Sequence, residues 1–142
     1  MGKMYLIDTN VISEVRKKSK ANKGVLRFFE QVTAQQTSIF LSVVTVGELR
    51  RGVELIRYRG DIPQAKLLER WLEELLTEFG ESILDINHDI AQLWGRLRVP
   101  HPQNALDKQI AATALIYDLI VVTRNLKDFS GTGVQLLNPF EY

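Results

Sequence analysis

Short apolar runs followed by helical periodicity recur along the chain, and this alternation is its clearest pattern. The first run covers residues 4–7 and stops at Asp8-Thr9-Asn10, residue types that favour caps and turns. This order predicts a strand, a loop and then a helix. The same order predicts further strands at residues 39–42 and 83–84 and helices at about residues 46–58 and 89–97.

A longer helical pattern covers residues 62–79, where leucines and Trp71 recur at three- and four-residue spacings, as in an amphipathic helix. The last part of the chain predicts a helix at residues 105–117 and strands at residues 119–123 and 134–137. Strands that alternate with helices indicate an α/β fold, a three-layer α/β/α sandwich with a central parallel sheet of about five strands. Functional sites in such sheets lie beyond the carboxyl ends of the strands.

Composition narrows the class of protein. A chain of 142 residues, 45% of them apolar, predicts a single domain over residues 1–142, and no repeat or linker divides it. It has no cysteine, which excludes disulfides and thiolate metal sites and favours the cytoplasm. No apolar run predicts a signal peptide or a membrane span. The net charge of +1 gives no global field for nucleic acid, so an anionic partner needs a local basic patch.

Three carboxylates are predicted to meet at one edge of the sheet. Asp8 follows the first strand, and Glu48 and Asp107 fall in the first turns of two predicted helices. Carboxylates placed together raise one another's pKa unless a cation neutralises them. Oxygen ligands without thiolate or imidazole favour Mg²⁺ or Mn²⁺, so we expect a divalent metal site.

A purely structural interpretation competes for two of these residues. Residues 45–48 and 104–107 both fit a capping box, in which the acidic residue bonds back to the helix cap. Asp8 fits a structural role less well, because a carboxylate at the end of a buried strand needs partners or a cation to offset its desolvation.

Several motifs resemble those of PIN-domain ribonucleases, in particular the toxins of the VapC and FitB kind. The resemblance spans nearly the whole chain in the family's order. It rests on Leu-Ile-Asp-Thr-Asn-Val-Ile-Ser-Glu at residues 6–14, Thr-Val-Gly-Glu-Leu-Arg-Arg-Gly at 45–52, Asp-Lys-Gln-Ile-Ala-Ala-Thr-Ala at 107–114, Val-Thr-Arg-Asn at 122–125, Asp-Phe at 128–129 and Asn-Pro-Phe at 138–140.

The resemblance implies a PIN-like fold and assigns Asp8, Glu48 and Asp107 as catalytic, metal-binding carboxylates. The family's fourth acidic position is occupied here by Asn125, whose amide supplies no negative charge to a second cation. Whether one or two metals bind therefore stays open. Asp128 is the alternative fourth group, ranked below Asn125 and also able to cap a short turn.

Neighbouring polar residues are candidates for supporting roles. Thr9, Asn10 and Thr123 are placed to orient Asp8 or a bound water, although Thr9 and Asn10 are also ordinary N-cap residues. An enzyme acting on RNA needs cations around its acidic centre. Arg50, beside Glu48, is the candidate RNA-binding residue, and the basic run at residues 16–20 is a further candidate for this rim.

The sequence thus predicts a Mg²⁺- or Mn²⁺-dependent endoribonuclease that hydrolyses RNA phosphodiester bonds. The resemblance further implies the toxin of a toxin–antitoxin pair, a homodimer and a cognate antitoxin. Two alternatives remain. One is a non-catalytic PIN-fold module that binds RNA or a partner. The other is an aspartyl-phosphate phosphatase using Asp8 as nucleophile, which the absence of a second acid at Asn10 disfavours.

Overall fold

A five-stranded sheet, parallel throughout, forms the centre of the computed structural model, which describes residues 2–142. The strand order is β3-β2-β1-β4-β5, which places β1 in the middle. There Leu6 pairs with Phe40 of β2 on one side and with Val121 of β4 on the other. The strands are β1 (Tyr5–Ile7), β2 (Ile39–Ser42), β3 (Ile83–Leu84), β4 (Ile120–Val122) and β5 (Leu136–Leu137).

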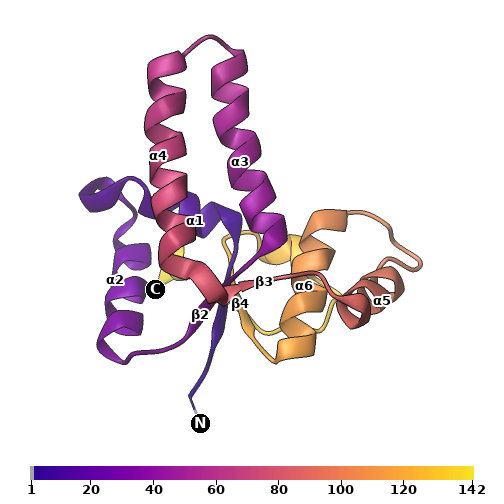
Figure 1. Ribbon diagram of the computed structural model, residues 1–142. Helices are drawn as coiled ribbons and strands as arrows, with labels where there is room; N and C mark the ends of the chain where they lie inside the picture. Colours follow the sequence, from indigo (N-terminus) through magenta and orange to yellow (C-terminus); the bar gives the residue numbers. More distant parts are fainter. Residues whose placement is uncertain (1) are drawn as a thin grey trace.

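Helices cover both faces of this sheet, which confirms the predicted α/β/α sandwich. In Figure 1, α1 to α4 lie on one side and α5 and α6 on the other, while α3 and α4 form a hairpin that projects beyond the sheet. The α-helices are α1 (Thr9–Val15), α2 (Lys23–Ala34), α3 (Val43–Tyr58), α4 (Ile62–Phe79), α5 (His88–Leu97) and α6 (Ala105–Tyr117). Short 3-10 turns are η1 (Lys18–Lys20), η2 (Gly80–Ser82), η3 (Leu126–Phe129) and η4 (Pro139–Glu141).

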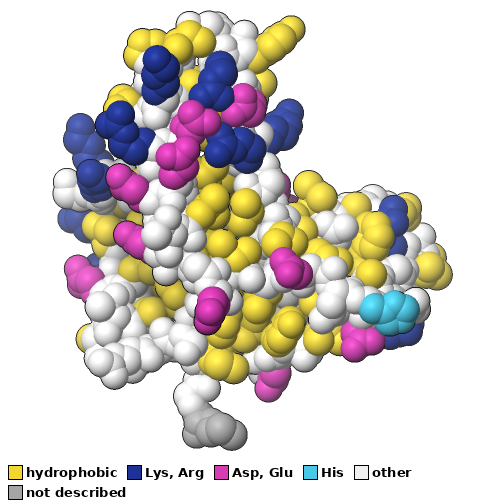
Figure 2. Space-filling view, in the orientation of Figure 1, with side chains coloured by type: hydrophobic (Ala, Val, Ile, Leu, Met, Phe, Trp, Pro, Cys, Tyr) yellow, Lys and Arg dark blue, Asp and Glu magenta, His cyan; other side chains and the backbone are white. Residues whose placement is uncertain are grey.

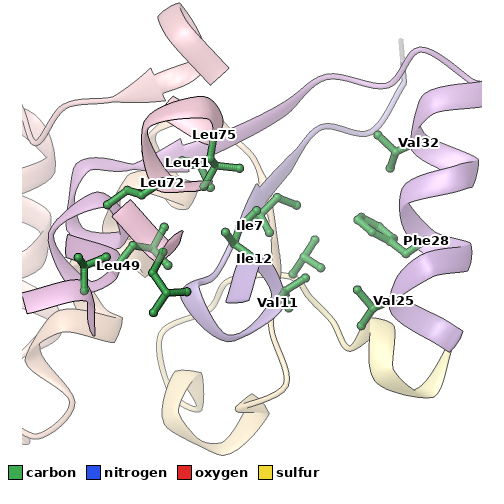
Figure 3. Close-up of a cluster of buried hydrophobic side chains, with 13 residues drawn as sticks. Ile7, Val11, Ile12, Val25, Phe28, Val32, Leu41, Leu49, Leu72 and Leu75 are labelled. Atoms are coloured by element: carbon green, nitrogen blue, oxygen red, sulfur yellow. The ribbon is translucent and has the colours of Figure 1, made fainter. Parts of the chain in front are cut away.

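The alternation of side chains along the strands divides the core in two. Ile7 and Val122 face the α1–α4 side, where they join Phe28 and Leu72 in the cluster shown in Figure 3. Their neighbours Leu6 and Val121 face the opposite side and pack with residues of α6. Both faces of β1 and β4 are buried, so these strands are continuously apolar until Asp8 and Thr123 follow them.

One predicted helix boundary was wrong. The helix expected from about residue 46 begins at Val43, directly after β2, and Ser42 caps it by accepting a hydrogen bond from the Val44 backbone N–H at 3.0 Å. The β-branched run at the start of α3 has low helix propensity, which hides the true beginning. Glu48 therefore lies in the second turn of α3 and not in the first.

Within residues 2–142, no helix combines the length and the apolar composition that a bilayer crossing requires.

Candidate active site

Asp8 lies at the carboxyl edge of the sheet, between β1 and the helix that it caps. Its backbone N–H continues the sheet by donating to the Val122 carbonyl at 2.9 Å. Its extended backbone then turns the chain into α1, and its side chain accepts from the Thr9 backbone N–H at 2.8 Å. The carboxylate is buried, with only 3% of the residue exposed.

Two further side chains bind the other oxygen of this carboxylate. The Thr123 hydroxyl donates to Asp8 Oδ2 at 2.8 Å, and Asn10 Nδ2 donates to the same oxygen at 3.0 Å. Asn10 in turn accepts from the Arg124 backbone N–H at 3.0 Å, which ties α1 to the end of β4. The supporting positions predicted for Thr9, Asn10 and Thr123 thus surround Asp8.

Burial raises the pKa of Asp8, and the nearby charge of Asp128 adds to this rise. The three hydrogen bonds oppose it, because they stabilise the ionised form. The hydrogen bonds orient the carboxylate without neutralising it, so a negative charge at this position still needs a counter-ion.

Glu48 reaches the same edge from α3. The Thr9 hydroxyl donates to Glu48 Oε1 at 2.9 Å and lies 3.4 Å from the hydroxyl of Thr45, which is fully buried. Ser42 and not Thr45 is the N-cap of α3, so the capping-box interpretation of residues 45–48 was wrong. The sequence presented Thr45 as a helix cap, and this concealed its position beside the carboxylates.

Asp107 is the most perturbed acid of the group. It lies in the first turn of α6, where the N-cap Asn104 has a left-handed backbone and makes no side-chain capping bond, so the second capping box is absent as well. Burial raises the pKa of Asp107 to about 7, with further contributions from the charges of Asp8, Asp128 and Glu48. These four acids therefore share one electrostatic environment.

The two candidates for a fourth position differ in their placement. Asn125 is exposed, and its backbone N–H donates to the Thr123 hydroxyl at 3.0 Å. Asp128 is half-buried on the turn η3, and its charge acts on both Asp8 and Asp107. Spacing along the sequence favoured Asn125, but the 3-10 turn carries the later residue back toward the site.

Carboxylate oxygens are ligands that suit a hard divalent cation, but in the described residues they are not gathered around one point. Across residues 2–142, no three acidic or histidine side chains stand at metal-ligand spacing around one point. The four acids also form no ion pair with a lysine or arginine in that part of the chain. Carboxylate oxygens with uncompensated mutual repulsion suit Mg²⁺ or Mn²⁺.

Arg50, the predicted RNA-binding residue, pairs with acids of the α3–α4 hairpin and with none of these four. Its guanidinium donates to Glu69 of α4 at 2.6 Å and lies 3.4 Å from Glu54, and these contacts raise its pKa. Arg16 instead lines the hollow that also contains Thr9 and Glu48.

Comparison with known proteins agrees with this geometry. Residues 5–133 match the PIN domain family. Toxin FitB of Neisseria gonorrhoeae is 32% identical over 142 residues, which cover 96% of this chain and 99% of the relative. VapC ribonuclease Y4jK of Sinorhizobium fredii is 30% identical over 141 residues, covering 97% of this chain and 99% of the relative.

A solved structure gives the same result. The crystal structure of FitAcB from Neisseria gonorrhoeae superposes with a TM-score of 0.83 at 31% identity and covers 98% of this chain and 100% of that chain. The match to the family covers most of the present chain, including Asp8, Glu48, Asp107 and Asp128. The chain therefore belongs to the PIN-domain family and resembles the FitB and VapC toxins within it.

Proposed function

We propose that this protein is a metal-dependent endoribonuclease that hydrolyses RNA phosphodiester bonds. The observation that carries the proposal is the gathering of Asp8, Glu48 and Asp128 around Asp107, and burial and these neighbouring charges raise the pKa of Asp107 to about 7. A folded protein that holds four acids together without a basic partner gains from a cation. The relative named VapC ribonuclease supports RNA as the substrate.

Asp8, Glu48 and Asp107 would hold the metal, and we propose Asp128 in preference to Asn125 as the fourth group. When bound, Mg²⁺ or Mn²⁺ supplies an activated water and stabilises the charge that develops on the phosphate. Asp128 provides the negative charge that an amide lacks, and its field already reaches Asp8 and Asp107.

The other polar residues of the site would hold these ligands in place. Thr123 and Asn10 fix one oxygen of Asp8, while the Thr9 hydroxyl fixes Glu48. Because Thr9 and Asn10 come from α1 and Thr123 follows β4, the packing of these two elements orients the carboxylates. Such supporting bonds reduce the reorganisation needed when a cation and a substrate arrive.

The phosphatase alternative is weakened by the contacts of Asp8. Both of its oxygens already accept hydrogen bonds, one from the Thr9 backbone and the other from Thr123 and Asn10. These bonds lower the nucleophilicity that a covalent mechanism needs. Residue 10 also donates to Asp8 through its amide and offers no acid for the leaving group.

We further propose that the protein acts in the cytoplasm as the toxin of a toxin–antitoxin pair and that a cognate antitoxin silences it. The similarity to Toxin FitB over 96% of this chain supports this role. A homodimer is also proposed. Its support is an exposed apolar stretch at the end of α6, formed by Leu115, Ile116 and Tyr117.

The test is cleavage of unstructured and hairpin RNAs by the purified protein with Mg²⁺, with Mn²⁺ and with EDTA. We expect metal-dependent cutting that falls by more than about a hundredfold in Asp8→Asn and in Asp107→Asn, since ligand loss exceeds the effect of losing a supporting residue. Equal cutting by the variants would identify a contaminant. Tight RNA binding without cleavage by the unmodified protein would favour the non-catalytic module.

A further inference from the structure

A continuous groove leads away from the proposed metal site along α1, α3 and α4. Its inner part, a hollow of about 210 Å³, begins at Thr9 and Glu48. Its outer part, about 510 Å³, lies between η1 and α4. The two parts share Arg16, Leu68 and Trp71, so one passage joins the carboxylates to the outer surface.

The outer part of the groove is rich in basic side chains that are not neutralised. Arg16, Lys18 and Arg70 line it and form no ion pair within residues 2–142, and only Glu74 opposes them there. Lys17 also lines it but pairs with Glu14 at 2.9 Å. Because the chain as a whole carries a net charge of only +1, this is a local concentration of positive charge.

Two neighbouring arginines on the hairpin, Arg50 and Arg57, are already paired with acids. Arg50 and Arg57 pair with Glu54 and Glu69, so their charges are already compensated. Figure 2 shows basic side chains gathered over the hairpin, where acidic side chains lie among them. Within residues 2–142, Arg16, Lys18 and Arg70 of the groove therefore differ from Arg50 and Arg57 in having no acidic partner.

An aromatic side chain lies in the middle of this charged passage. Trp71 is half-buried, packs against the core on one side and contributes to both parts of the groove. Leu67 and Leu68 flank it in the outer part. An indole that is held by the core in a groove lined by cations is an arrangement on which nucleic-acid bases stack.

We propose that this groove binds single-stranded RNA next to the cleaved bond, with its phosphates on Arg16, Lys18 and Arg70 and one base stacked on Trp71. The inference rests on the proposed nuclease function and adds the path of the substrate. Cations surrounding an aromatic platform favour a flexible polyanion over an acidic peptide, because only the nucleic acid uses both features at once. A duplex keeps its bases stacked inside and cannot use Trp71.

The first test measures binding of an end-labelled oligouridine by fluorescence anisotropy over a range of salt concentrations. All proteins carry Asp107→Asn, so the RNA stays intact. The triple variant Arg16→Ala, Lys18→Ala, Arg70→Ala should raise Kd by about tenfold or more and lower the slope of log K against log salt by about 2, at about 0.7 per lost contact.

A matched control removes the same charge elsewhere. Arg51, Arg59 and Arg96 are exposed, lie outside the groove and form no ion pair across residues 2–142. Their triple alanine variant should bind RNA nearly as tightly as the parent. If the two triple variants lose RNA affinity equally, RNA responds to the overall positive charge of the protein and not to the groove. That result would overturn the inference.

The second test examines stacking through tryptophan fluorescence, since Trp71 and Trp94 are the two tryptophans of the chain. Oligouridine should quench the emission of Trp94→Phe, which retains Trp71, and leave that of Trp71→Phe unchanged. Trp71→Leu should raise Kd by about tenfold while Trp71→Phe retains most of the affinity, because phenylalanine still stacks. Quenching that depends on Trp94 instead would contradict the proposed path.

Failure of the groove and failure of the nuclease are distinguishable. If the unmodified protein cuts RNA with metal but the groove variants keep their RNA affinity, the groove is not the substrate path and the proposed function stands. If these variants keep their affinity for RNA but no longer bind a cognate antitoxin, the groove is a protein-docking site. If the unmodified protein neither cuts nor binds any RNA, both proposals fail.

Discussion

The molecule has two clusters of charged side chains, one on the α3–α4 hairpin and one at the carboxyl edge of the sheet, and they handle charge in opposite ways. On the hairpin, Glu54 and Glu69 meet Arg50 and Arg57 at distances between 2.5 and 3.4 Å. Hydrogen bonding to Arg57 is the main cause that holds the pKa of Glu54 below its usual value. Each charge there has a partner, and the cluster links α3 to α4.

At the sheet edge the acids have no such partner. Asp8 is buried and Asp107 is half-buried, and burial raises the pKa of both. Hydroxyl and amide groups orient the carboxylates there, but no cation of the described chain cancels their charge.

The contrast indicates which cluster is structural and which is functional. Paired surface charges contribute little to stability and need nothing further. Buried acids held together against their own repulsion reduce stability, and they gain from a ligand that removes the repulsion. Three predictions test this difference.

The largest expected effect concerns the fourth position of the acidic cluster. Asp128→Asn should weaken Mn²⁺ binding about 10- to 100-fold, because it removes a charge whose field reaches both Asp8 and Asp107. Asn125→Ala should change the affinity much less, since the contact of Asn125 with Thr123 is made by its backbone N–H. Isothermal titration calorimetry measures both.

The reverse order of these two effects would restore the amide as a ligand. Glu54→Gln is the matched control, as it neutralises an acid that is already paired with Arg57 on the hairpin. It should leave the Mn²⁺ affinity unchanged.

The second prediction concerns pH. The pKa of Asp107 is raised from 3.8 to about 7, so the folded protein holds this proton more tightly than the unfolded chain does. The metal-free protein should therefore lose stability as pH rises from about 4 to about 7, and the loss should be complete above that range. Asp107→Asn should reduce this dependence. Thermal unfolding in EDTA measures it as a fall in Tm of several degrees.

Added Mg²⁺ should stabilise the protein, and this stabilisation should increase as pH rises. Because the acids must be deprotonated to bind a cation, Mg²⁺ should raise Tm far more at about pH 8 than at about pH 5. A metal-induced rise in Tm that is the same at both values would show that Asp107 does not couple protons to metal.

Much of the fold was predictable because its signals are local. Apolar runs ending at Asp8 and Thr123 predicted the central strands, and the spacing of leucines predicted α4 from residue 62 to residue 79, as found. The start of α3 was not predictable, because β-branched residues of low helix propensity follow β2 directly and conceal the cap at Ser42.

The placement of the acids was predictable where a residue ends a strand or lies near the start of a helix. The charges of Asp8 and Glu48 act on Asp107, as expected for residues placed at one sheet edge, and their role as metal ligands stays a prediction. Which residue lies fourth depends on the turn η3, and the partner of Arg50 depends on how α4 folds back onto α3. Both are contacts between distant segments, which the spacing within one motif does not reveal.

The smallest expected effect concerns the ion pair between Arg50 and Glu69 on the hairpin. A double-mutant cycle of Arg50→Ala and Glu69→Ala should give a coupling of about 0.5 kcal/mol by denaturant unfolding, since both side chains are about one third exposed and water screens the pair.

RNA affinity and cleavage should stay unchanged in Arg50→Ala, because its guanidinium is held by α4 and lies outside the groove. A coupling of several kcal/mol would make the hairpin network a major contributor to the fold. A loss of RNA affinity in Arg50→Ala would mean that the ion pair opens to release a cation to the substrate, and the division between paired and unpaired charges would no longer separate structure from function.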